Sequence, residues 1–293
     1  MADLTPPPAN DHSDDIAIHP KHSGDKRRKL RRWVNRITLA LLILSPLIFI
    51  IAAVGYKLGL FDLGVAFGML NQKIGPLVVL ICGAFGLISV VLAFIVKPRK
   101  GLIVGILAVL IPLVAIGKLK ATEKAVYVKL PFIHDVTTDT QDPPVFGSVV
   151  MAERAKVKGV NTADYIGKKA PKFNAQKEKT GEGLVSAMQT KAFPDIRPLV
   201  IDSSKDVVFG EALATAKAMG WKIKEQDPAT GRIDATDTTF WYGFQDDVTI
   251  RLRDAKGGGT VVDVRSLSRI GGSDLGKNAE RVGEFLERMG QTG

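Results

Sequence analysis

Three uncharged, apolar stretches dominate the N-terminal part of the chain, at residues 37–54, 74–96 and 101–117. Each has close to the roughly 20 apolar residues that an α-helix needs to cross the hydrocarbon core of a bilayer. Residues 55–73 lie between the first two stretches, carry few charges, and are expected to form a short loop along the membrane interface. The pattern therefore predicts a membrane anchor of three transmembrane helices over residues 37–117.

Positive charge is concentrated at two places beside this anchor. Residues 26–36 are rich in Lys and Arg, and the turn at residues 97–100 is basic as well. Cytoplasmic loops of membrane proteins carry an excess of such residues, so both segments are expected in the cytoplasm, and three spans then leave everything after about Lys118 outside. We therefore expect a multi-pass protein of the bacterial inner membrane, with a disordered, basic cytoplasmic tail at residues 1–36 and a periplasmic C-terminal domain.

The spans themselves contain no Asp, Glu, Lys, Arg or His. Proton relays and ion pathways use such side chains inside the membrane, so we interpret the spans as an anchor in the lipid bilayer. Gly75, Gly83, Gly86 and Gly105 allow helices to approach closely, which leaves open a homo-oligomer formed through the transmembrane helices. The single cysteine, Cys82, lies within the second span, so no intramolecular disulfide can form.

The C-terminal part of the chain has a different pattern, in which apolar residues recur at short periods. Strict alternation predicts four strands, and spacings of three and four residues predict a helix on each side of them. The predicted elements in chain order are a helix at residues 204–219, strands at 221–225, 232–238, 247–253 and around 262–264, and a helix at 275–289. Short antiparallel strands flanked by helices predict a two-layer α+β domain at residues 193–293. Residues 118–192 precede it as an extracytoplasmic connector.

The strand pair before the last helix gathers arginine and aspartate on one side. Alternation turns the apolar residues of both strands one way and places Arg251, Arg253, Asp263 and Arg265 on the opposite, open face. Two interpretations remain. The residues form a ladder of cross-strand ion pairs, each contributing about 0.2–1 kcal/mol, or they form a surface that binds an anion.

Residues 271–278, G-G-S-D-L-G-K-N, nearly spell a nucleotide-binding P-loop. Asn278 stands where that loop needs a Ser or Thr hydroxyl for Mg²⁺, Asp274 would place negative charge beside the phosphates, and too few residues follow for the remainder of such a site. We interpret the segment as a glycine turn in which Ser273 or Asp274 accepts the free N–H groups at the start of the last helix.

The strings F-Q-D-D-V-T-I-R at residues 244–251 and V-D-V-R-S-L-S-R-I-G-G-S-D-L-G-K-N-A-E-R at residues 262–281 resemble the domain-of-unknown-function family 1499. An upstream block at residues 131–146, P-F-I-H-D-V-T-T-D-T-Q-D-P-P-V-F, is similar to the segment that leads into the membrane-anchored members of that family. The resemblance covers roughly residues 125–290 and implies no established activity. The chain departs from the family pattern directly after Arg281, where Val and Gly stand in place of a further basic residue.

The positive net charge raises the question of nucleic-acid binding. The chain has 293 residues and a formal net charge of +10, which would suit a polyanion. Much of that charge lies in the two basic runs beside apolar segments, and the aromatic residues do not interleave with a basic stripe as they do in single-strand binding proteins. We therefore expect no nucleic-acid partner.

Two groups of residues keep an enzyme in consideration. His134, Asp135 and Asp139 lie in a turn-rich loop and could ligate a divalent metal, although such a loop also suits docking on the sheet. Asp246 and Asp247 are adjacent on a strand, so they face opposite ways and cannot act together as an acid–base pair on one substrate. No Ser-His-Asp spacing is present. A periplasmic hydrolase or metal-dependent enzyme that uses this Asp/Arg/His cluster is therefore the alternative function.

The function favoured by the sequence is an integral membrane protein that presents an extracytoplasmic α+β binding domain. We expect no catalytic residues and no cofactor, and favour a binding protein over an enzyme. The expected partner is an envelope protein or an anionic small ligand. The residues expected to bind it are Asp246, Asp247, Arg251, Asp263, Arg265, Arg269, Asp274, Asn278 and Arg281.

Overall fold

The computed structural model describes the backbone of residues 21–292 and the side chains of residues 24–121 and 129–291. The tail expected at residues 1–36 therefore lies partly outside the described residues. The first helix, α1 (Lys21–Lys57), begins 16 residues before the apolar stretch that starts at Ile37. The basic run that precedes the first span is thus the first part of a helix and not a disordered segment.

Among the described residues, three helical segments are long and apolar enough to cross a membrane, at Gly24–Lys57, Gly64–Ile95 and Leu102–Ala121. They lie within the elements α1, η1 (Gly64–Ile74), α2 (Gly75–Ile95) and α3 (Leu102–Lys129). The prediction of three candidate spans is confirmed. The interfacial loop predicted at residues 55–73 is shorter than expected, since α1 continues to Lys57 and η1 begins at Gly64.

Glycines bring α2 and α3 into close contact. A Cβ added at Gly86 would lie 2.8 Å from the Cβ of Ala108, and a Cβ added at Gly105 would lie 2.9 Å from the carbonyl oxygen of Gly86. Side chains at these two positions would push the helices apart, so glycine permits the packing, as it does in many membrane proteins. These two glycines therefore act within one chain, and a homo-oligomer through the helices stays a prediction.

The C-terminal part is built on one antiparallel sheet of six strands. Five of them follow the order β1-β8-β7-β6-β5, and β4 pairs with another part of β8. The strands are β1 (Asp135–Thr137), β4 (Leu199–Ile201), β5 (Lys222–Asp227), β6 (Arg232–Thr238), β7 (Gln245–Asp254) and β8 (Thr260–Ser268). β7 and β8 form the predicted hairpin, in which Arg251 is opposite Asp263.

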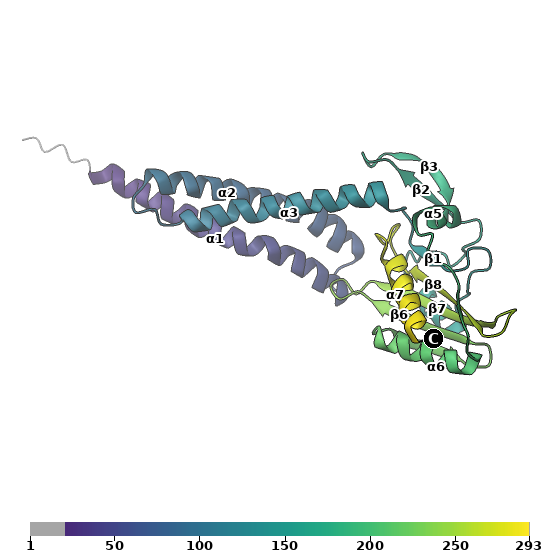
Figure 1. The fold of residues 1–293 in the computed structure, drawn as a ribbon. Helices are drawn as coiled ribbons and strands as arrows, with labels where there is room; N and C mark the ends of the chain where they lie inside the picture. Colours follow the sequence, from purple (N-terminus) through teal and green to yellow (C-terminus); the bar gives the residue numbers. More distant parts are fainter. Residues whose placement is uncertain (1–20, 293) are drawn as a thin grey trace, which may run out of the picture. The chain divides into compact units, whose positions relative to one another are not determined.

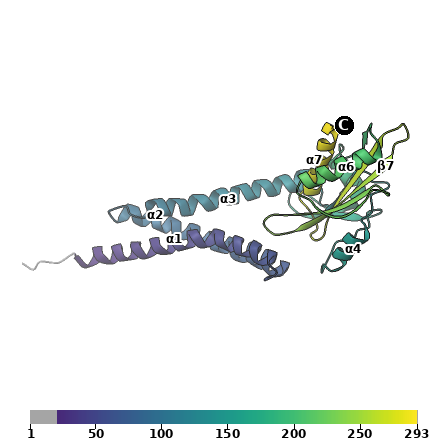
Figure 2. The ribbon, with the colours of Figure 1, turned by 90° about the horizontal axis from the view of Figure 1, so that it is seen from below.

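Two helices, α6 (Lys205–Ala218) and α7 (Lys277–Thr292), cover one face of this sheet (Figure 1). Figure 2 shows them on one side of the sheet and α4 (Ser148–Ala155) on the other. The alternating apolar residues of the strands meet the apolar stripes of α6 and α7 in the main core, which includes Val208, Ala212, Ile233, Val248, Ile250, Val262, Val264, Val282, Phe285 and Met289. The α+β fold class is confirmed, with three candidate membrane-spanning helices ahead of an antiparallel sheet packed with helices.

The segment that the sequence assigned to a connector is part of this fold. β1 pairs with β8, and Val136 packs with Tyr165, Val185 and Ala279 in a second apolar cluster. A separate hairpin, β2 (Lys169–Phe173) and β3 (Lys179–Leu184), leads into α5 (Val185–Ala192). The domain therefore begins near Asp135 and not at residue 193, because this segment completes the edge of the sheet and covers its second face.

Candidate functional site

The polar face of β7 and β8 is covered by residues 138–165, a covering segment that includes α4. Pro144 and Ala163 of this segment accept hydrogen bonds from Arg265 at 3.2 and 2.6 Å, and Asp263 and Arg265 are only 0% and 2% exposed. The expectation of an open face is therefore wrong. The residues of this face form three groups of ion pairs, each with a buried aspartate at its centre.

Asp247 is the centre of the first group. It is fully buried and accepts hydrogen bonds from Arg154 of α4 at 2.8 Å and from the Thr236 hydroxyl at 2.8 Å. Arg269 donates to both of its carboxylate oxygens, at 2.7 and 2.9 Å, and also to Glu153 of α4 at 2.9 Å. One aspartate on β7 thus joins the sheet to the helix that covers it.

Burial and pairing have opposite effects on the charges of this group. Burial lowers the pKa of the Arg154 guanidinium, and its hydrogen bond to Asp247 only partly offsets that effect. Burial alone would lower the pKa of Arg269 as well, but the hydrogen bonds to Asp247 and Glu153 outweigh it and the pKa is raised. Each buried guanidinium depends on its carboxylate, so removing Asp247 would leave both arginines short of a partner.

Asp135 of β1 is the centre of the second group. Arg265 donates Nε and Nη2 to its two carboxylate oxygens at 3.0 and 2.9 Å, and Lys168 Nζ lies 3.1 Å from it. Burial lowers the pKa of Lys168. The Arg265 guanidinium also lies over the rings of Phe146 and Tyr165, 5.2 and 5.5 Å from their centroids. Arg265 therefore joins β8, β1 and the covering segment.

Asp263 is the centre of the third group, which is the cross-strand ladder predicted from the sequence. Arg251 donates to Asp263 at 3.1 Å, and Arg253 does so at 2.8 Å. The two arginines also lie 3.7 and 3.3 Å from Asp139, and Arg251 lies 3.0 Å from Asp142. Three carboxylates thus surround two guanidinium groups, so this end of the face carries net negative charge and does not favour an anionic ligand.

Asp246 points to the opposite face of the sheet, as its position beside Asp247 predicts. Arg281 of α7 donates to Asp246 at 2.8 Å and to Asp237 at 2.7 Å. The side-chain oxygen of Asn278, one helical turn earlier, accepts a hydrogen bond from the same guanidinium at 2.6 Å. The polar residues on this face therefore fix α7 to the ends of β6 and β7.

The glycine-rich turn before α7 is closed by Asp274. Its carboxylate accepts the backbone N–H groups of Gly276 at 2.9 Å and Asn278 at 2.8 Å, which confirms the interpretation of this segment as a helix N-cap. Burial raises the pKa of Asp274. Between these bonded residues Leu275 has a φ of 56°, in the left-handed region that leucine rarely adopts. Its side chain is 56% exposed.

His134, Asp135 and Asp139 are not gathered into a metal site. His134 Nδ1 lies 3.2 Å from the carbonyl oxygen of Gly272, and burial lowers the pKa of this histidine. Asp135 pairs with arginine and lysine as described above, and Asp139 accepts two backbone N–H groups of its own turn. Over the side chains that the structure describes, no group of three or more His, Cys, Asp or Glu could hold a metal ion. The segment docks on the sheet, as the other interpretation of this loop predicts.

Two open depressions flank α7, where the sequence predicted no cavity. The larger has a volume of about 470 Å³, and its apolar lining includes Leu130, Phe193, Ile196, Leu275 and Ala279. The smaller, of about 290 Å³, is lined by charged residues of α7 together with Trp221 and Met219. The sequence signal for the larger depression is a lone leucine inside the polar turn S-D-L-G-K.

The fold and its ion pairs define a candidate membrane protein with an α+β domain. A six-stranded antiparallel sheet carries helices on one face and an ion-paired covering segment on the other, and three candidate membrane-spanning helices precede it. The chain belongs to the family described as protein of unknown function, DUF1499, whose family model matches residues 135–289. The match runs from β1 to α7, and it confirms the resemblance seen in the sequence. No curated protein matches the chain.

Proposed function

We propose that the chain is an integral protein of the bacterial inner membrane that keeps its N-terminus in the cytoplasm and presents the α+β domain in the periplasm, where the domain binds a partner protein. The observation that carries the binding role is Leu275, an exposed leucine held in a strained backbone conformation at the edge of the larger depression.

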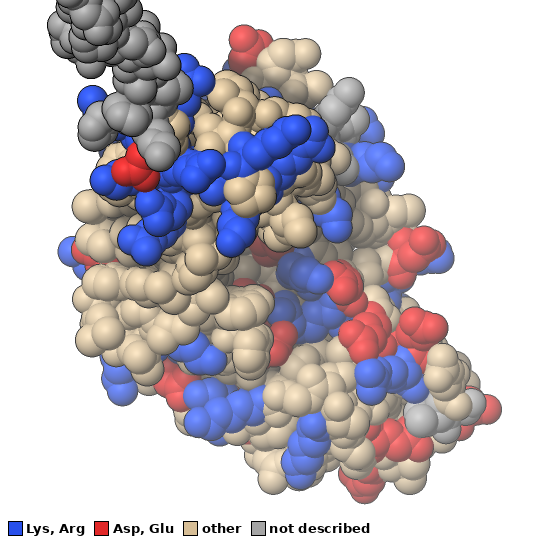
Figure 3. Space-filling model, turned by 90° about the vertical axis from the view of Figure 1, so that its left-hand side faces the viewer, with Lys and Arg blue, Asp and Glu red and all other residues tan. Residues whose placement is uncertain are grey.

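Contacts inside the helical part support the orientation. Arg31 Nη1 donates to the carbonyl oxygens of Val96, at 2.8 Å, and Pro98, and Asn35 Nδ2 donates to that of Lys100 at 2.9 Å. The basic start of α1 therefore contacts the basic turn between α2 and α3. Figure 3 looks onto this end of the helices, and Lys and Arg gather there with little Asp or Glu among them. Two positive segments at one end favour the cytoplasmic side for that end.

Cysteine labelling tests this orientation. In a Cys82→Ala background, Lys256→Cys in the exposed turn between β7 and β8 is expected to react with a membrane-impermeant maleimide in cells whose outer membrane admits the reagent. Lys26→Cys is expected to react only after the inner membrane is opened. The reverse order of labelling would place the domain in the cytoplasm.

Backbone strain at Leu275 supports the binding role. A leucine in the left-handed region costs on the order of 1–2 kcal/mol, and this side chain gains little burial in return because it is 56% exposed. Such strain persists where surrounding bonds over-determine the backbone, and it clusters at binding sites. The two hydrogen bonds to Asp274 supply that constraint. The strain does not stabilise the fold, so we attribute it to presenting the leucine to a partner.

The depression beside Leu275 suits an apolar side chain of a protein partner. Phe193 and Ile196 provide apolar lining, and Asp195 and Glu280 provide a polar rim, a combination typical of protein interfaces. The arginines that would capture an anion are already paired with Asp135, Asp247 and Asp263. We therefore favour a protein over an anionic small ligand.

The residues predicted to bind the partner enter this proposal in two ways. Asp274, Asn278 and Arg281 lie in the turn and first part of α7, and they position Leu275 and the helix. The others hold α7 or the covering segment on the sheet, and they are Asp246, Asp247, Arg251, Asp263, Arg265 and Arg269.

The substitution Leu275→Gly tests the binding role. Glycine adopts positive φ without strain, so the midpoint of thermal unfolding should not fall and should rise by a few degrees, although the side chain is lost. On blue-native electrophoresis of solubilised membranes, the wild-type chain is expected in a complex larger than itself and the Leu275→Gly chain outside it. Mass spectrometry of the band distinguishes a partner protein from a second copy of the chain.

A matched control is Val207→Ala, which trims another exposed aliphatic side chain on α6. This variant should keep the complex. Survival of the complex in Leu275→Gly, or its loss in both variants, would argue against a contact at Leu275.

The alternative, a periplasmic hydrolase or metal-dependent enzyme that uses the Asp/Arg/His cluster, stays a prediction. Within the described residues the carboxylates and arginines of that cluster pair with one another. No observation favours this alternative over a binding domain.

A further inference from the structure

The basic start of α1 is not uniform. Arg31 is 4% exposed and turns inward, toward the carbonyl groups between α2 and α3. Arg32 and Arg36 are exposed on the outer side of the helix. The run of Lys and Arg at residues 26–36 therefore contains an arginine that joins helices and a pair of arginines that faces the surroundings of the protein.

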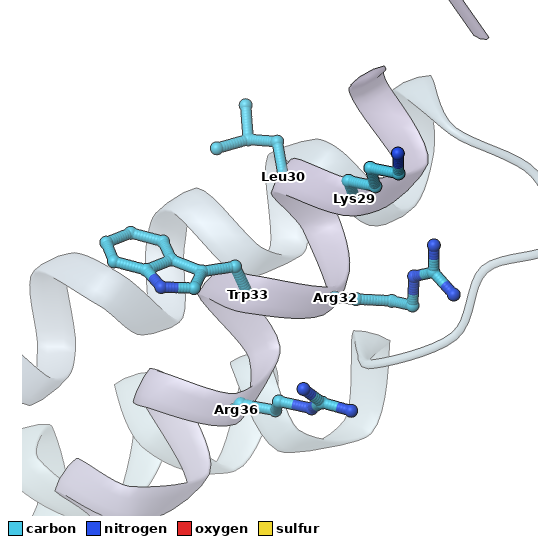
Figure 4. Close-up of a pocket in the computed structure, with 5 residues that line it drawn as sticks. All are labelled: Lys29, Leu30, Arg32, Trp33 and Arg36. Carbon is cyan, nitrogen blue, oxygen red and sulfur yellow. The ribbon is translucent and has the colours of Figure 1, made fainter. Parts of the chain in front are cut away.

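Arg32 and Arg36 line a surface depression of about 520 Å³ together with Lys29, Leu30 and Trp33. Figure 4 shows the two arginines extending to one side of α1, and Trp33 and Leu30 extending to another. Four residues advance an α-helix by about 6 Å. Residues four apart are neighbours on one face of a helix, so the two arginine side chains can reach the same phosphate group.

The charges in this depression are only partly neutralised by the chain. Lys29 Nζ lies 3.1 Å from the Asp25 carboxylate. Arg32 and Arg36 make no ion pair with the described part of the chain. A guanidinium stays charged, and its fork of N–H donors fits the oxygens of a phosphate. The arginine pair therefore favours a ligand that carries a phosphate.

The position of the pair along α1 identifies the source of that phosphate. The apolar stretch begins at Ile37, directly after Arg36, in the first candidate span. Trp33, one turn earlier, is 59% exposed, and tryptophan is enriched at the level of the lipid headgroups. Two guanidinium groups and an indole ring thus lie where a span leaves the hydrocarbon, at the depth of the lipid phosphates.

We propose that Arg32 and Arg36 bind the phosphate of an anionic phospholipid, with Trp33 beside the lipid's glycerol region. The site does not depend on which side of the membrane holds the N-terminus, nor on partner binding at Leu275. A basic residue near an anionic bilayer strengthens binding roughly fivefold, so the pair should contribute roughly 30-fold.

Native mass spectrometry of the full chain tests this proposal, after release from micelles that contain equal amounts of phosphatidylglycerol and phosphatidylcholine. The wild-type chain is expected to retain phosphatidylglycerol in preference. Arg32→Gln/Arg36→Gln should lower that preference by roughly 30-fold. Lys26→Gln/Arg27→Gln removes the same charge from residues outside the depression. Arg27 lies ten residues before Ile37, about 15 Å along the helix, where the attraction to the headgroups is largely screened, so this variant should keep most of the preference. Unchanged unfolding midpoints show that both variants fold.

Three results would overturn the site. Equal loss in the two double variants would mean that the whole basic run attracts lipid without a specific pair. A wild-type chain with no preference would remove the anionic lipid altogether. Displacement of the retained lipid by excess inorganic phosphate would mean a site for free anions, whereas the proposal expects the lipid to remain bound.

Discussion

Asp247→Ala is expected to lower the free energy of unfolding of the domain by about 3–5 kcal/mol, the cost of breaking a buried ion pair from one side. The substitution removes the carboxylate that Arg154 and Arg269 share, at 2.8 and 2.7 Å, and leaves both guanidinium groups short of an acceptor inside the protein. Domains have only about 5–15 kcal/mol of stability in total, so this loss is a large share.

Trp221 provides the measurement. It is buried and stacks on Phe285, with 5.3 Å between the ring centroids, so its emission follows unfolding of the domain in the detergent-solubilised full chain. The midpoint for Asp247→Ala should fall by on the order of 10 °C. Asp142→Ala is the matched control, because that carboxylate is 70% exposed and also pairs with an arginine; it should cost less than about 1 kcal/mol. Small, equal losses in both variants would mean that the Asp247 group does not stabilise the fold.

Arg265→Met is expected to destabilise the domain by a similar amount and also to free the covering segment. Methionine fills much of the volume but has no N–H donors, so Pro144 and Ala163 lose a hydrogen bond and Asp135 keeps Lys168 as its ion-pair partner. A buried carboxylate that loses its bidentate arginine costs about 3–5 kcal/mol. Because Arg265 joins β8 to the covering segment, residues 138–165 should be the first to lose their ordered contacts with the sheet.

Hydrogen exchange tests this prediction by comparing two parts of the domain. Amides of residues 138–165 should exchange faster in Arg265→Met than in the wild-type chain, while those of β6 change less. Arg197→Met is the matched control, since Arg197 is 75% exposed and lies 3.9 Å from its acidic partner. Exchange of the covering segment that stays at the wild-type rate in Arg265→Met would show that other contacts hold it.

The strands and helices of the domain could be predicted because their patterns depend on near neighbours. Val248, Ile250 and Leu252 lie in the main core, as alternation predicts. Asp274 caps α7 because its carboxylate reaches N–H groups two and four residues later. Interactions between residues this close in the chain can be predicted from the local sequence pattern.

The cover over the arginine face could not be predicted in the same way. Arg265 and Asp135 are 130 residues apart in the sequence, and the covering segment has no regular period that marks its partner. Alternation identifies which residues share a face, but the burial of that face depends on distant segments. The ion-pair ladder and the anion-binding surface therefore had the same local signature at Arg251 and Asp263.

Leu275 was missed for a different reason. Its positive φ results from hydrogen bonds made by the residues on either side of it. Such a backbone angle at a leucine cannot be recognised from the residue types alone. The glycines of the turn are the residues expected at such angles. The apolar pattern therefore predicts Leu275 as the first residue of the following helix, whereas α7 begins at Lys277.

Photo-crosslinking from two positions decides between the Leu275 edge and the covering segment as the place of partner contact. One probe, p-benzoylphenylalanine, replaces Leu275, and the other replaces Val145, which is 72% exposed on the covering segment. In intact membranes we expect a discrete adduct from position 275 and none from position 145. An adduct from position 145 and none from position 275 would contradict the proposed contact and assign it to the covering segment.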